Sequence, residues 1–92
     1  IITENNTFNG TLNNLAILEN LTIEGTIGQN GFNVQWSTKL SKASITSIIN
    51  ALSSTTSGLT VTLSKTAVNN AFTTEEWDAL IATKTNWNIS LV

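Results

Sequence analysis

The carboxylates whose spacing could support acid–base chemistry lie in one short stretch of the chain, at Glu75, Glu76 and Asp78. Two neighbouring carboxyl groups can act as general acid and general base when burial separates their pKa values. Here they fall in the first turns of a predicted amphipathic helix, where acidic side chains cap the backbone and interact favourably with the helix dipole. We therefore interpret this cluster as structural.

Side chains for nucleophilic or metal chemistry are missing from the composition, because the 92 residues include no His, Cys, Met, Tyr or Arg. The sequence therefore has no imidazole base, thiol nucleophile, Cys/His zinc site or disulfide. A Ser nucleophile would need a Lys base, but no Ser-x-x-Lys occurs. No calcium-loop spacing surrounds the isolated Glu19 and Glu24, and the Gly-rich residues 25–31 lack the order of a phosphate-binding loop. We predict no catalytic residue, metal or cofactor, and thus no enzyme.

Neutral hydrogen-bonding groups dominate the composition, with 16 Thr, 13 Asn and 9 Ser residues. Four Lys against six acidic residues give a net charge of -2, so we expect no nucleic-acid partner. No apolar run approaches the roughly 18 residues that span a bilayer, so membrane insertion is not expected. A sparsely charged surface of this kind is common in exported bacterial and virion proteins. The composition therefore favours an extracellular, cell-surface or virion location.

The length fits a single domain over residues 1–92. The chain starts at Ile1 without an initiating Met or a signal-peptide pattern. This start favours an excised part of a longer protein.

Two stretches carry the i, i+3, i+4 spacing of apolar residues that predicts an amphipathic helix. The first covers about 42–53, with Ser41 as N-cap and Leu40 packing on Ile45 as a hydrophobic staple. The second covers about 74–84 and repeats this order. Its staple residue, N-cap, capping-box acid and staple partner are Phe72, Thr73, Glu76 and Trp77.

Each predicted helix is followed by a turn and an alternating segment, which predicts a half-buried strand. These strands cover 59–63 and 87–91, and residues 21–27 predict a third strand of the same kind. Their polar side chains should align as a flat ladder, the usual binding face of a solenoid. The residues of this candidate binding face are Thr22, Glu24, Thr60, Thr62, Asn88 and Ser90.

Residues 28–39 place Phe32, Val34 and Trp36 in alternation after a Gly/Asn-rich stretch. They fit either a hairpin with a Gly/Asn turn or an extended loop whose large apolar residues tuck under the sheet edge. We favour the loop, because parallel strands joined through helices give the rest of the chain a consistent topology. All three Trp residues, including Trp77 and Trp87, fit core positions.

Three segments, 40–52, 58–63 and 72–87, resemble the leucine-rich-repeat-like C-terminal segments of bacterial cell-surface proteins and of phage tail or other structural proteins. The shared features are the helix-turn-strand order and a final Lys-x-x-Trp, Lys84 to Trp87, before the last strand. Asn86 stands where such segments usually carry Gly. The resemblance implies an α/β leucine-rich-repeat-like solenoid fragment, with about three parallel strands and two helices on one face.

We therefore expect a non-enzymatic binding or structural module of a bacterial surface or phage protein, which contacts a protein or glycan ligand. The alternative is a carbohydrate-binding module that uses exposed Trp rings, since an aromatic face flanked by amides suits a sugar. The strand at 87–91 would be an open edge unless something caps it, which also makes an edge-strand homo-oligomer an expectation.

Overall fold

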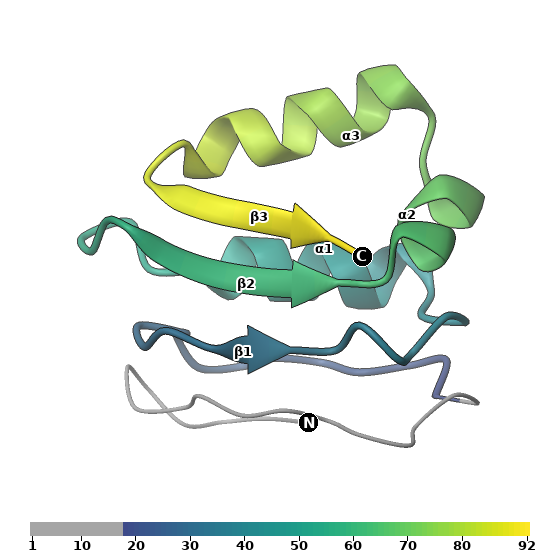
Figure 1. The fold of residues 1–92 in the computed structure, drawn as a ribbon, viewed down its shortest axis with the longest axis horizontal. Helices are drawn as coiled ribbons and strands as arrows, with labels where there is room; N and C mark the ends of the chain where they lie inside the picture. Colours follow the sequence, from purple (N-terminus) through teal and green to yellow (C-terminus); the bar gives the residue numbers. More distant parts are fainter. Residues whose placement is uncertain (1–17) are drawn as a thin grey trace.

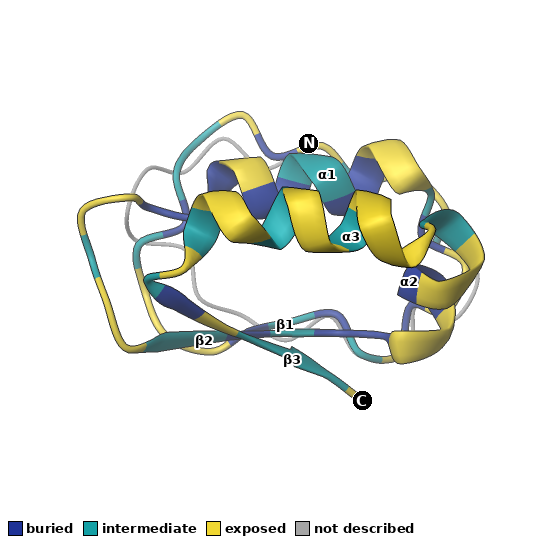
Figure 2. Cartoon of the chain, turned by 90° about the horizontal axis from the view of Figure 1, so that it is seen from above, coloured by how far each residue is buried: buried dark blue, intermediate teal, exposed yellow. Residues whose placement is uncertain are grey.

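Three parallel strands and the helices between them form the described part of the chain, which in the computed structural model is residues 18–92. The remainder of the predicted domain, residues 1–17, lies outside the described residues. The elements in chain order are β1 (Phe32–Asn33), α1 (Lys42–Ala51), β2 (Leu59–Leu63), α2 (Lys65–Ala71), α3 (Thr74–Ile81), the 3-10 helix η1 (Ala82–Lys84) and β3 (Trp87–Leu91). The sheet order is β1-β2-β3, with both pairs parallel. Helices α1 and α3 lie over one face of the sheet, and α2 lies at its end (Figure 1, Figure 2).

Both predicted helices begin at their predicted caps. The Ser41 hydroxyl accepts a hydrogen bond from the backbone of Ser44, and Thr73 and Glu76 form the complete capping box of α3. Both α-helices end earlier than predicted. Helix α1 ends at Ala51, because Leu52 has an extended backbone and forms a β-bridge with Ile27. Helix α3 ends at Ile81, where the chain continues as the 3-10 helix η1.

The core lies between α1 and the sheet. Ile45, Ile48 and Ile49 of α1 are at most 1% exposed, which confirms the apolar stripe that predicted the helix. They belong to one cluster with the inward residues of all three strands. Val61 and Leu63 of β2 and Trp87 of β3 are buried, which confirms the predicted inward face at these positions, whereas Ile89 and Leu91 of β3 are only half-buried.

Helix α2 was not predicted. It is seven residues long, too short to show a helical period, and contains two Asn residues of low helix propensity. Ser64 caps it by accepting a hydrogen bond from the backbone of Ala67 at 3.2 Å, and Ala67 and Val68 are buried. Capping and tertiary packing, rather than periodicity, therefore determine this helix.

The strand predicted over 21–27 is wrong. Ile23 and Ile27 are buried, as their alternation required, but the segment runs beside α1 instead of forming a strand of the sheet. Ile27 forms an isolated parallel bridge with Leu52. The third strand of the sheet is β1.

Hydroxyl groups of α1 accept hydrogen bonds from the backbone of this segment. The backbone N–H of Leu21 donates to Ser44 Oγ at 2.8 Å, and that of Ile23 donates to Ser47 Oγ at 2.9 Å. Residues three apart lie on the same helix face, so Ser44 and Ser47 can serve one extended segment.

The two-residue strand β1 lies within residues 28–39 and pairs in parallel with β2, with Phe32 opposite Val61. The parallel pairing rules out the hairpin. The predicted loop is correct for most of this segment, but it did not include strand β1. Phe32 and Val34 are fully buried, whereas Trp36 is 42% exposed. Its predicted core position is wrong because the chain turns at 35–36 and the alternation stops.

Two buried serines provide a test of these assignments. Ser64 caps α2, whereas the fully buried Ser37 Oγ has no hydrogen-bond partner. Ser64→Ala should lower the free energy of unfolding by about 1 kcal/mol. Ser37→Ala should leave it unchanged or raise it by up to about 1 kcal/mol, because the substitution removes an unsatisfied buried hydroxyl. Urea denaturation measures both, and a larger loss at Ser37 than at Ser64 would contradict the assignment.

Candidate functional site

The candidate site is the face of the sheet that the helices leave uncovered (Figure 2). The register pairs Thr60 with Asn88 and Thr62 with Ser90, and Asn88 Nδ2 donates to Thr60 Oγ1 at 3.3 Å. Asn33 of β1 lies opposite Thr62. We call these five residues the polar sheet face. They form two cross-strand rows of neutral hydroxyl and amide groups, which can donate and accept hydrogen bonds.

The structure brings together four of the six predicted binding-face residues. The other two, Thr22 and Glu24, are exposed but lie in the segment beside α1, so their place in the ladder is wrong. Asn33 takes the position next to β2 instead. Its sequence signal is the alternation of Phe32, Asn33 and Val34, which lies within the segment that the sequence favours as a loop.

Loop amides fix the edge of the polar sheet face. Asn30 Oδ1 accepts from the backbone N–H of Thr60 at 2.8 Å, and the backbone N–H of Gly31 donates to the carbonyl of Thr60 at 3.3 Å. Gly31 has φ +99°, a left-handed conformation that favours glycine. The turn before β1 is therefore held against β2, and Asn33 Oδ1 accepts a hydrogen bond from the backbone N–H of Gln35 at 2.9 Å.

Side chains from residues 84–87 bind the backbone carbonyls that follow α1. Lys84 Nζ donates to the carbonyl of Leu52, and both Asn86 Nδ2 and Trp87 Nε1 donate to the carbonyl of Ser53, at 2.9 and 2.8 Å. The Lys-x-x-Trp pattern thus has a structural role in this chain. Asn86 adds a bond that a Gly could not make. Trp87 is buried as predicted, whereas Trp77 is only half-buried.

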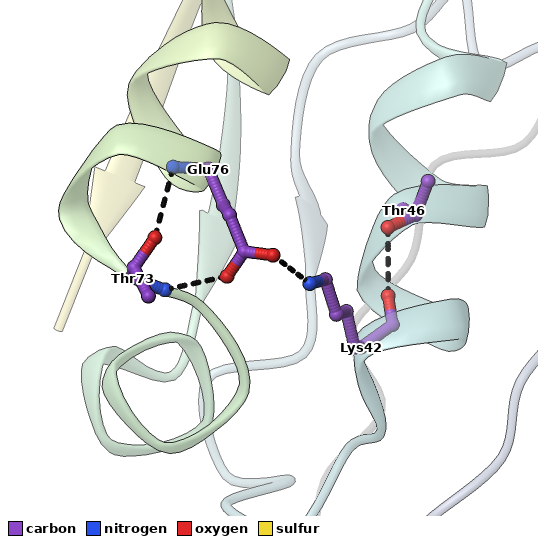
Figure 3. Close-up of polar contacts among 4 residues, drawn as sticks. All are labelled: Lys42, Thr46, Thr73 and Glu76. Atoms are coloured by element: carbon purple, nitrogen blue, oxygen red, sulfur yellow. Dashed lines mark hydrogen bonds and ion pairs between the residues drawn. The ribbon is translucent and has the colours of Figure 1, made fainter.

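The Glu76 carboxylate holds α3 against α1, as Figure 3 shows. Glu76 accepts from the backbone N–H of Thr73 at 2.9 Å and pairs with the ammonium group of Lys42 (Figure 3). The Lys42 hydrogen bond, followed by the bond from Thr73, lowers the pKa of Glu76 to about 2. The Lys42 ammonium also lies 5.5 Å from the Phe72 ring centroid. Glu76 is therefore ionised near neutral pH and caps α3. This role agrees with the structural interpretation of the acidic cluster.

Within residues 18–92, no group of three or more His, Cys, Asp or Glu residues could hold a metal ion. No helix in the same range is long and apolar enough to cross a membrane. No family model, curated protein sequence or solved structure matches this chain.

The ion pair of Glu76 predicts a pH dependence of stability. Because folding lowers its pKa from 4.5 to about 2, the stabilisation is complete above pH 4.5 and is lost as the pH falls towards 2. Glu76→Gln should remove this component of the pH dependence. Glu75→Gln, a matched control on the same helix, should retain it. Urea midpoints between pH 7 and pH 2 measure the effect, and equal profiles for Glu76→Gln and the wild type would exclude this role.

Proposed function

We propose that the chain is a non-enzymatic binding or structural module of a bacterial surface or phage protein, and that the polar sheet face contacts its protein or glycan ligand. The observation that carries this proposal is the in-register array of Asn33, Thr62 and Ser90 beside Thr60 and Asn88. These groups are uncharged, lie on rigid strands, and face away from the helices. Such a surface can bind a partner through many neutral hydrogen bonds without an unpaired charge to desolvate.

The leucine-rich-repeat-like solenoid architecture is part of this proposal. It is supported by two successive units in which a capped helix precedes a parallel strand, α1 with β2 and α3 with β3. The units differ in the connection, where the second contains α2 before its helix cap. Solenoids accept insertions between their repeated elements and commonly bind partners on the strand face.

A second candidate function is carbohydrate binding, favoured by the exposure of Trp36. This residue is 42% exposed and lies in a turn with Gln35, three residues after Asn33 of β1. Aromatic rings stack on the apolar faces of sugars, while nearby amides satisfy their hydroxyl groups. This candidate requires only Trp36, because Trp77 is half-buried and Trp87 is buried.

A charge placed on the polar sheet face tests the first proposal. Immobilised wild-type chain is used to capture proteins from bacterial envelope extracts and from purified phage particles, with mass spectrometry as the readout. Thr62→Lys should abolish specific capture, because a Lys at the centre of the array blocks close approach. Thr66→Lys, an exposed control on α2, should preserve it.

Both variants should retain the far-UV circular dichroism of the wild type, since neither position is buried. Equal capture by the wild type, Thr62→Lys and Thr66→Lys would reject the polar sheet face as the contact surface.

The carbohydrate alternative is tested by titrating soluble N-acetylglucosamine oligomers and peptidoglycan fragments while following Trp emission. Binding at Trp36 should shift the emission and protect it from acrylamide quenching. Trp36→Ala should abolish both effects, whereas Thr62→Lys should retain them. Unchanged emission of the wild type at millimolar sugar would exclude this function for these probes.

A further inference from the structure

Strand β3 is an edge strand whose outward backbone groups have no partner among residues 18–92, where it pairs with β2 alone. The carbonyl of Asn86 accepts from Gly58, and the N–H and C=O of Val92 bond to Leu63 and Lys65. Backbone groups of successive strand residues point to alternate sides. The N–H and C=O groups of Trp87, Ile89 and Leu91 therefore point away from β2.

This edge lacks the features that normally prevent edge pairing. The residues of β3 include no charged side chain and no Pro, and its register with β2 is continuous from Leu59–Trp87 to Leu63–Leu91, without a bulge. Its apolar and polar residues alternate symmetrically about Ile89. The strand is therefore complementary to an antiparallel copy of itself, with apolar residues opposite apolar residues and polar opposite polar.

An apolar groove of about 450 Å³ lies beside the same edge, between α3 and β3. Its lining residues include Ile81, Ala82, Trp87 and Ile89. The corresponding positions in the first unit are covered: Ile45, Ile48 and Ile49 of α1 are at most 1% exposed, whereas α3 has no buried residue. The second unit thus has an apolar stripe that residues 18–92 cover only in part.

The charges beside the groove are arranged for an antiparallel neighbour. Asp78 and Lys84 both line it, three residues before and three residues after Ile81. Two antiparallel α3 helices would bring Asp78 of each copy towards Lys84 of the other, whose ammonium group has three N–H donors and already donates to the carbonyls of Leu52 and Asn50. The helix dipoles would also oppose each other favourably.

We propose that this edge is a symmetric dimer interface and that its occupant is a second copy of the chain. The twofold axis passes Ile89 perpendicular to the sheet, so that both copies keep their helices on the same face. Ile89 faces Ile89 of the second copy as a hydrogen-bonded pair, and Trp87 faces Leu91 in the same way. The result is a continuous six-stranded sheet in which α3 packs against α3. This inference concerns the sheet edge and does not depend on the function of the polar sheet face.

Analytical ultracentrifugation of the 92-residue chain, from about 1 μM to about 1 mM, tests the association. The wild type should move from 9.9 kDa towards twice that mass. Ala82→Lys, in the exposed part of the groove lining, should weaken dimerisation at least about tenfold by placing like charges near the axis. Ala79→Lys, at an exposed position of α3 outside the groove lining, should not.

A wild type that stays monomeric overturns the proposal, and so does a dimer that Ala82→Lys and Ala79→Lys affect equally.

A disulfide experiment tests the register independently, because the chain contains no cysteine of its own. In the proposed dimer Asn88 faces Ser90 of the second copy as a non-hydrogen-bonded pair, with Cα atoms about 4.5 Å apart, within disulfide range. Asn88→Cys and Ser90→Cys chains are mixed and oxidised. The mixed disulfide should dominate over both homodisulfides. A statistical mixture, or no crosslink under conditions in which the wild type dimerises, overturns the register.

Discussion

The rest of the structure depends on how the backbone carbonyls after α1 are satisfied. Leu52 and Ser53 are buried, and no residue near them in sequence supplies all the donors that their carbonyl groups need. The donors come from the second unit, as the side chains of Lys84, Asn86 and Trp87. The backbone carbonyls at the end of α1 thus obtain their hydrogen-bond donors from residues just before and at the start of β3. We therefore expect the two units to fold together and not separately.

This arrangement separates the apolar residues of the core from the polar groups at the surface. The apolar side chains of β1 and β2, with Trp87 at the start of β3, face the helices and build the core, while the hydroxyl and amide groups face outward. Changes on the outward face alter what the protein can contact at little cost in folding free energy. Substitutions on the inward face cost more folding free energy, because its residues fill the space between α1 and the sheet.

The two units are similar in design but unequal in burial. Helix α1 lies against the core and buries its apolar stripe fully, whereas α3 lies over the outer part of the sheet and leaves Trp77, Leu80 and Ile81 half-buried. An element at the end of a layer has a neighbouring element on one side only, so part of its apolar surface stays exposed; among residues 18–92 this applies to α3 and β3. The half-buried stripe of α3 and the open edge of β3 have this same physical origin.

The sequence by itself determined the elements whose signals are local. The caps at Ser41 and Thr73 set the starts of α1 and α3, and strict alternation set β2 and β3, because hydrogen bonding and side-chain direction within a few residues decide these features. It also identified four residues of the polar sheet face. Only the tertiary structure decided which segment became the third strand. Residues 21–27 and 28–39 both alternate, and the choice depended on Ser44 and Ser47 of α1, which bind the first segment and leave the place beside β2 to Phe32 and Asn33. This competition for hydrogen-bond partners involves residues more than twenty positions apart. A pattern within a few neighbouring residues therefore cannot predict it.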